Sequence, residues 1–289
     1  MSQFSSPAMP SPVANRLFGV SLLGHGSRRG RCTDEGLREA SRRLAERLSG
    51  VAVVREAFFE FLEPTLEDSL AYFQNRGLRR VVVMPYFLFD GKEIKRDIPR
   101  LLSALRPRFP GLDVTLASNL GVDDRLISLV TERVAGALHG LGQLLPIGGR
   151  LPIWGESGPV GVILVNRGSR PQYDNGGRLR ELCDRLSQAL EDVPVEPAQA
   201  ERSPILTIAN AAQRLIEARC ERIVVVPYLH FPGKVLFVNV IPVVNQLAES
   251  YPEARFYLAS TLCVDDRLID ICVDRIRQAI SPASRSVDE

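Results

Sequence analysis

Short apolar runs rich in β-branched residues alternate along the chain with longer segments whose apolar residues recur every third or fourth position. The first pattern is typical of buried strands and the second of amphipathic helices. In the first half we expect strands near 17–23, 51–59, 81–85 and 114–120, and helices over 37–48, 65–76, 94–105 and 123–138. Strands that alternate with helices predict a parallel sheet covered on both faces.

The same pattern occurs a second time. Three matched segments lie 142 residues apart, represented by Ser27 and Ser169, Pro85 and Pro227, and Asp123 and Asp265. A shared offset of this kind indicates that a whole domain was duplicated. We therefore expect an α/β protein of two tandem, flavodoxin-like domains, each with a parallel four-stranded sheet.

The boundaries follow from the repeat and from composition. The chain divides into a disordered tail at 1–15, a first domain at 16–139, a linker at 140–159 and a second domain at 160–280. The tail is rich in Ser and Pro and the linker in Gly and Pro, residues that favour irregular structure.

Residues 81–99 are the segment that most strongly indicates a functional site. A β-branched run reaches Pro85, which cannot donate to a sheet, so regular pairing should stop there. A charged segment, 90–99, follows directly. Open α/β sheets bind ligands beyond the carboxyl ends of their strands, and this segment lies at such an end.

The other strand ends of the first half carry chemically useful side chains as well. His25 lies between two glycines after the first strand, and Glu60 and Glu63 follow the second. An imidazole and carboxylates beside Arg and Lys suit two tasks: holding a divalent metal ion while a base removes protons, or binding a polyanionic organic ligand.

Composition excludes several classes of function. The 289 residues carry a net charge of only +2, which does not favour a nucleic-acid partner. No apolar run is long enough to span a membrane, and the first residues lack the pattern of a signal peptide, so we expect a cytoplasmic protein. Five scattered cysteines without a C-x-x-C pair argue against disulfides, zinc–thiolate sites and iron–sulfur clusters.

Nucleotide binding and serine catalysis are also poorly supported. The loop 24–28 contains glycines between a strand and a helix, but it lacks the full G-x-G-x-x-G fingerprint and the G-K-[ST] of a P-loop. Ser27 lacks the G-x-S-x-G context of a nucleophile elbow. We therefore expect no nucleotide cofactor.

The residues 23–28 (L-G-H-G-S-R), 83–91 (V-M-P-Y-F-L-F-D-G) and 95–99 (K-R-D-I-P) resemble the CbiX/SirB family of class II chelatases. The resemblance extends over about 17–279 and implies two chelatase-like domains in one fused chain. It implies insertion of Fe²⁺ or Co²⁺ into sirohydrochlorin without ATP, in a cleft between the domains. It further implies a monomer that forms an internal pseudo-dimer.

The resemblance also implies the metal ligands. The family's H-G-S-R loop supplies one histidine, which corresponds to His25. A second histidine usually follows the glycine of the L-F-x-G motif by two residues, and here Glu93 replaces it. A carboxylate also binds Fe²⁺ or Co²⁺ and accepts a pyrrole proton more readily than a metal-bound imidazole. A His–Glu pair resembles the one in protoporphyrin ferrochelatases, which are similar in fold.

The second half is expected to form a wall for the macrocycle. We take Asn166 and Val235 as the equivalents of His25 and Glu93, so neither ligand is repeated. For His230 a wall role and a metal contact both stay open. The candidate substrate-binding residues are Ser27, Arg28, Phe89, Gly91, Lys92, Lys95, Asn119, Asn166, Arg167, Ser169, Arg170 and His230.

Two other functions compete with a chelatase that acts in siroheme or cobalamin biosynthesis, with iron preferred over cobalt. One is a non-catalytic carrier of a tetrapyrrole or a metal, which the missing ligands of the second half would suit. The other is an unrelated α/β transferase that shares only the fold.

Overall fold

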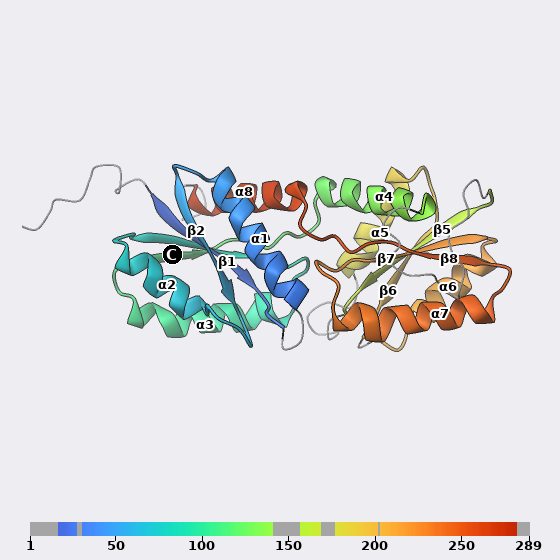
Figure 1. The fold of residues 1–289 in the computed structure, drawn as a ribbon, viewed down its shortest axis with the longest axis horizontal. Coiled ribbons are helices and arrows are strands. Elements are labelled where there is room, and N and C mark those ends of the chain that lie inside the picture. The colour runs from blue at the N-terminus through green and yellow to red at the C-terminus, as the bar shows by residue number, and fades with distance from the viewer. Residues whose placement is uncertain (1–16, 28–30, 141–156, 169–176, 202, 282–289) are drawn as a thin grey trace, which may run out of the picture.

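A computed structural model describes residues 17–27, 31–140, 157–168, 177–201 and 203–281 (Figure 1). The expected tail, most of the expected linker, and Arg28, Ser169 and Arg170 lie outside the described residues. Within the described ranges, no helix has both the length and the hydropathy needed to cross a membrane.

The first half alternates strands and helices as expected. Its elements are β1 (Phe18–Gly24), α1 (Arg31–Arg47), β2 (Ala52–Phe58), α2 (Leu66–Asn75), β3 (Arg80–Pro85), the π-helix η1 (Glu93–Asp97), α3 (Ile98–Leu105), the 3₁₀-helix η2 (Arg106–Arg108), β4 (Asp113–Leu116) and α4 (Asp124–Leu138). Thr65 caps α2 through a reciprocal pair of hydrogen bonds with Asp68, which explains why the helix begins where the sequence indicates.

The second half repeats this order. Its elements are β5 (Val160–Asn166), α5 (Gly177–Ala189), β6 (Val195–Gln199), α6 (Ile208–Glu217), β7 (Arg222–Pro227), the π-helix η3 (Val235–Val240), α7 (Ile241–Ser250), β8 (Arg255–Leu258) and α8 (Asp266–Ile280). Both central strands, β3 and β7, end at the proline where pairing was expected to stop.

The two sheets are parallel, four-stranded and alike in topology. Their strand orders are β2-β1-β3-β4 and β6-β5-β7-β8. Val20 of β1 pairs with Val54 and Val82, and Val162 of β5 pairs with Val195 and Val224. The predicted α/β class with two tandem parallel sheets is confirmed.

Apolar side chains form three core clusters. One lies between the first sheet and α2 and α3, and another between the second sheet and α6 and α7. The third is shared by both halves, because it joins residues of α1 and α8 over the first sheet to residues of α4 and α5 over the second. The two sheets therefore share one continuous layer of buried apolar side chains.

The last helix of each half packs on the sheet of the other half. Figure 1 shows α8 beside α1 over the first sheet and α4 beside α5 over the second. The domain boundaries at 139 and 160 follow the sequence repeat and stay a prediction. In the structure, one helix that covers each sheet comes from the opposite half of the chain. The amphipathic pattern of 123–138 predicts the helix and not which sheet it covers.

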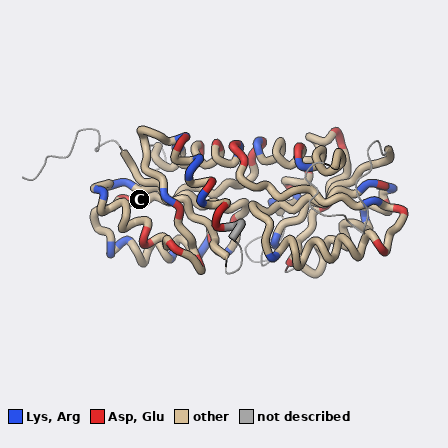
Figure 2. The backbone as a smooth tube through the Cα atoms, in the orientation of Figure 1, with Lys and Arg blue, Asp and Glu red and all other residues tan. Residues whose placement is uncertain are grey.

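Pairs of polar contacts related by the repeat hold the exchanged helices in place. Arg125 forms an ion pair with Asp274 at 2.8 Å, and Arg267 forms one with Glu132 at the same distance. Arg133 donates to the carbonyls of Thr261 and Leu262, and Arg275 donates to those of Asn119 and Leu120, all at 3.2 Å. Figure 2 shows that basic and acidic residues alternate along the two helices that cover the sheets on this side, α4 and α8.

Candidate functional site

The loop after β1 places His25 at the carboxyl edge of the first sheet. Its shape depends on Gly26, which has φ of +83°; a Cβ there would lie 1.9 Å from the carbonyl oxygen of Glu60. The backbone N–H of Glu60 also donates to the carbonyl of His25. Glycine at this position therefore fixes the direction in which the imidazole leaves the sheet.

The segment after β3 places Glu93 opposite this imidazole. Glu93 is the first residue of η1, and π-helical turns are frequent at functional sites. Two ion pairs hold residues 90–97. Asp90 pairs with Arg178 of the second half at 2.7 Å, and Lys92 pairs with Asp97 at 3.0 Å. Both are partly exposed, so they serve mainly to orient the loop.

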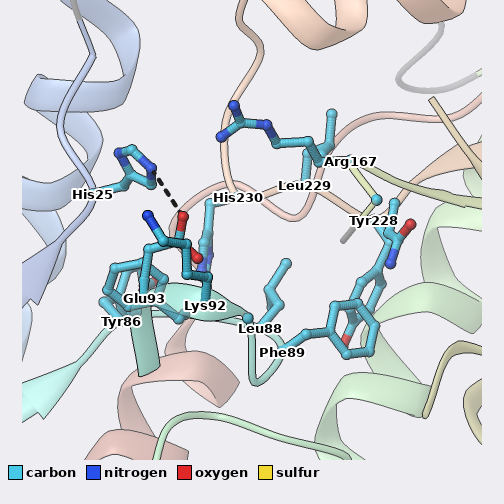
Figure 3. Close-up of a pocket in the computed structure, with 14 residues that line it drawn as sticks. His25, Tyr86, Leu88, Phe89, Lys92, Glu93, Arg167, Tyr228, Leu229 and His230 are labelled. Atoms are coloured by element: carbon cyan, nitrogen blue, oxygen red, sulfur yellow. Dashed lines mark ion pairs between the residues drawn. The ribbon is translucent and has the colours of Figure 1, made fainter. Parts of the chain in front are cut away.

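Nε2 of His25 lies 3.7 Å from Oε1 of Glu93, and both side chains are about 30% exposed. The rings of Phe59 and Phe87 flank the imidazole, with centroids 6.5 and 6.3 Å away. Figure 3 shows the imidazole and the carboxylate directed toward each other at one end of a cleft.

The pair shifts the proton affinities of both members. The facing carboxylate of Glu93 raises the pKa of His25 above its usual 6.5, and partial burial opposes this only in part. In turn His25 lowers the pKa of Glu93 to about 2. The carboxylate therefore stays ionised at neutral pH, and the imidazole is the member of the pair that holds a proton more readily than normal.

The cleft lies between the two halves and has a volume of about 220 Å³. The first half contributes His25 and residues 86–89 and 91–93, and the second contributes Asn166, Arg167, Gly168 and residues 228–230. Aromatic rings meet across it: Phe89 lies 5.2 Å from Tyr228 and Tyr86 lies 4.3 Å from His230, centroid to centroid. Tyr86 and Tyr228 are almost fully buried, so the apolar surface open to a ligand comes mainly from Phe87, Phe89 and Leu229, with the charged groups toward one end.

His230 stacks on Tyr86 with an angle of 19° between the ring planes. Neither of its ring nitrogens makes a hydrogen bond of good geometry within the described part of the chain, although a backbone group of Tyr86 interacts with the imidazole and acts to raise its pKa. Burial lowers its pKa to about 3, so the imidazole is neutral. In this geometry His230 is a neutral ring that lines the cleft and packs against Tyr86.

Comparison with known proteins identifies the family. Residues 19–137 and 161–279 each match the family model called CbiX, and together these matches cover most of the chain. The chain belongs to the CbiX family. The duplication predicted from the sequence coincides with the two matches.

Two relatives show which CbiX proteins this chain is similar to. A sirohydrochlorin cobaltochelatase from Methanosarcina acetivorans is 36% identical over 128 residues, which are 42% of this chain and 97% of that protein. The chloroplastic sirohydrochlorin ferrochelatase of Arabidopsis thaliana is 32% identical over 120 residues, 42% of this chain and 52% of that protein. The match thus spans about half of the plant protein.

Solved structures share the whole CbiX fold of this chain. The sirohydrochlorin chelatase SirB from Bacillus subtilis subspecies spizizenii, crystallised in complex with cobalt, is 21% identical with a TM-score of 0.71. The alignment covers 93% of this chain and 98% of that one. SirB from Bacillus subtilis with Fe³⁺ gives a TM-score of 0.72 at 19% identity, with 93% and 97% covered. At this identity the likeness establishes the fold alone.

The structure brings most of the candidate residues of this CbiX protein together and places others elsewhere. The cleft is lined by His25, Phe89, Gly91, Lys92, Glu93, Asn166, Arg167 and His230. Ser27 and Lys95 are not among its lining residues, and Asn119 lines a neighbouring pocket with Asp90 and Arg178. Arg28, Ser169 and Arg170 lie outside the described residues.

One expected equivalence is wrong: the residue that corresponds to His25 is Arg167 and not Asn166. The backbone N–H of Glu201 donates to the carbonyl of Arg167 as that of Glu60 does to His25. Gly168 has φ of +99° and its Cβ would meet the Glu201 carbonyl oxygen, as Gly26 does with Glu60. Asn166 corresponds to Gly24. The other equivalence agrees with the structure, because Glu93 and Val235 each begin a π-helix.

Five further residues line the cleft in the first-half segment and its repeat without having been candidates: Tyr86, Phe87, Leu88, Tyr228 and Leu229. A signal for the two tyrosines was present, because a Pro-Tyr pair ends the central strand of each half. The apolar side chains gave no separate signal, since an apolar residue after a strand is as typical of a core as of a ligand wall.

The His25–Glu93 pair could hold a divalent ion at two points. Two ligand atoms that each lie about 2.1 Å from a tetrahedral ion are about 3.4 Å apart. Nε2 of His25 and Oε1 of Glu93 are 3.7 Å apart, so only a small movement would let both bind one ion. Over the described ranges, no group of three or more His, Cys, Asp or Glu residues is arranged to hold a metal. A two-ligand site would leave the other coordination positions for water and an incoming ligand.

Proposed function

We propose that this CbiX protein inserts a divalent metal ion into sirohydrochlorin. The observation that carries the proposal is the His25–Glu93 pair at one end of a cleft whose walls are aromatic. The relatives named for this reaction support the choice of macrocycle. The half-buried rings of Phe87 and Phe89, together with Leu229, offer an apolar surface that suits a flat tetrapyrrole.

The cleft volume is smaller than that of most pockets that enclose a drug-sized ligand, which are about 300–1,000 Å³. The macrocycle would therefore insert one edge and extend out of the cleft. Its carboxylates would then meet the cations at the rim, Lys92 and Arg167, since guanidinium and ammonium groups bind carboxylates. Both walls belong to one chain, so a single chain supplies the whole site.

The reaction replaces two pyrrole protons of the ring by one metal ion. While His25 and Glu93 hold the ion, neither can accept a proton. As the ion passes to the ring nitrogens, the imidazole is released beside an ionised carboxylate that raises its pKa, and His25 takes up one proton. The other proton passes to water. The pair thus exchanges a metal ion for a proton, and no nucleotide is needed.

A pKa of about 2 makes Glu93 a weak base in the empty site, so its contribution is to hold the ion and to stabilise protonated His25. We propose Fe²⁺ as the preferred ion and Co²⁺ as the second. Imidazole and carboxylate bind both, but Fe²⁺ comes earlier in the Irving–Williams order, so it is held less tightly and released more readily.

The test is an anaerobic insertion assay with purified protein, sirohydrochlorin and either Fe²⁺ or Co²⁺. The absorbance change of the macrocycle should be faster with the wild type than without protein, and His25→Ala should reduce this acceleration by about 100-fold or more. A carrier of the tetrapyrrole would bind it and leave the spontaneous rate unchanged, and that result would reject the proposed activity.

A further inference from the structure

Arg167 takes the place of the metal-binding histidine in the second half. The equivalence rests on the backbone bonds and the left-handed glycines described above, and it puts a permanent positive charge where the pseudo-symmetric site would hold a second imidazole. Val235 replaces Glu93 at the same time. The second half thus lacks both ligands and carries a charge that repels a metal ion.

The guanidinium group of Arg167 also faces the metal site of the first half. It lines the same cleft as His25 and Glu93, and Figure 3 shows its end directed from the second half toward them. Its Nε lies 3.5 Å from Oε2 of Glu201, and its side chain is 48% exposed. Its charge acts on both members of the pair, because it lowers the pKa of His25 and that of Glu93.

A charge in this position acts oppositely on the two substrates of the proposed reaction. A divalent cation bound by His25 and Glu93 is repelled by the guanidinium, so the empty cleft binds metal more weakly than the pair alone would. A polycarboxylate is attracted by the same group, and a carboxylate that binds it cancels the repulsion. Binding of either substrate then favours binding of the other by the same factor.

We propose that Arg167 couples the two substrates: it opposes the metal ion in the empty cleft and binds a carboxylate of the macrocycle, which favours metal binding once the macrocycle is present. This inference rests on the proposed function for the identity of the macrocycle. It makes Arg167 a positioning residue that keeps the metal site weak until an acceptor is in place.

The first test measures Co²⁺ affinity by calorimetry on the full chain without macrocycle, at fixed pH and low salt. Arg167→Gln should bind Co²⁺ about three- to tenfold more tightly than the wild type. Arg167→Lys, which keeps the charge, should bind it like the wild type. Arg214→Gln is the matched control, because Arg214 is similarly exposed and paired with Glu196, at 2.7 Å, but does not line the cleft.

The second test measures sirohydrochlorin affinity in the presence of a chelator that removes metal ions. Arg167→Gln should bind the macrocycle more weakly than the wild type, and Arg214→Gln should not. Co²⁺ affinity of Arg167→Gln equal to that of the wild type, or an unchanged affinity for sirohydrochlorin, would overturn the proposal.

The coupling itself is tested with an octacarboxylate porphyrin whose centre is already filled by copper, so that it cannot accept Co²⁺. After correction for Co²⁺ bound by the porphyrin alone, it should raise Co²⁺ affinity more in the wild type than in Arg167→Gln. An equal rise in both proteins would contradict the coupling. None of these measurements needs turnover. If the protein showed the coupling but did not insert metal, the proposed activity would be rejected and the role of Arg167 in coupling would stand.

Discussion

His25 and Glu93 leave different strands of the first sheet, β1 and β3, and meet with Nε2 and Oε1 3.7 Å apart. Adjacent parallel strands place their carboxyl ends side by side, which explains how residues so far apart in sequence face one another. The second half keeps the strands and the loops but has Arg167 and Val235 at the corresponding positions. Duplication has thus left one His–Glu pair, to which we assign the metal ion, and one cationic wall.

Replacing Glu93 by Gln should lower turnover far more than it lowers affinity for the macrocycle. The substitution keeps the size of the side chain and removes the charge that holds the metal and stabilises protonated His25. We expect insertion to slow by about 100-fold, with sirohydrochlorin affinity changed much less. Steady-state assays and equilibrium titration check this, and wild-type turnover in Glu93→Gln would remove the carboxylate from the mechanism.

Metal binding to the macrocycle-free protein should weaken as the pH falls through the pKa of His25. That pKa is raised above 6.5, so the imidazole is protonated, and unable to bind metal, at pH values where an ordinary histidine is already neutral. Co²⁺ titrations from pH 5.5 to 8.5 should give a midpoint above 6.5. In Glu93→Gln the midpoint should fall, because the group that raises the pKa is gone; a midpoint that does not move would contradict the coupling within the pair.

His230 should behave as a neutral ring. With a pKa lowered to about 3 by burial, it should not titrate between pH 5 and 8 in NMR spectra. Replacement by Phe keeps the stack on Tyr86 and removes two buried nitrogens that make no hydrogen bond of good geometry, so stability should stay within about 1 kcal/mol of the wild type or rise. Replacement by Ala should lower the free energy of unfolding by about 1–3 kcal/mol. Titration of His230 near neutral pH would reject the wall role.

Because α4 and α8 each pack on the sheet of the other half, a substitution in one half should destabilise the sheet of the other. Ile276 of α8 and Val134 of α4 are equivalent, buried residues that pack in the shared core. Ile276→Ala should cost about 2–5 kcal/mol and lower hydrogen-exchange protection more in β1 and β3 than in β5 and β7. Val134→Ala is the reciprocal control and should affect the second sheet more. If each substitution weakened mainly its own half of the sequence, the exchange of helices would be wrong.

Much of the fold could be predicted from the sequence because the signals are local. Pro85 and Pro227 mark the ends of the central strands, Thr65 and Asp68 mark a helix start, and the offset of 142 residues marks the repeat. The exchange of α4 and α8 could not be predicted, because an amphipathic helix carries no mark of which of two similar sheets it covers.

The site was predictable to a similar degree. His25 and Glu93 lie at predicted strand ends, and the structure brings them together. Matching Asn166 to His25 was an error of one residue; the offset that relates Ser27 to Ser169 already points to Arg167. The stack of His230 on Tyr86 joins the two halves, and such a contact depends on domain packing that local patterns do not encode.

The most direct test of the account is a single-turnover transfer of metal from the protein to the ring. Wild-type protein loaded with one equivalent of Co²⁺ is mixed with metal-free sirohydrochlorin and an excess of a chelator that captures any Co²⁺ released to solvent. Most of the Co²⁺ should appear in the macrocycle with the wild type and in the chelator with His25→Ala. Equal capture by the chelator in both proteins would contradict the claim that the His25–Glu93 pair hands the ion to the ring.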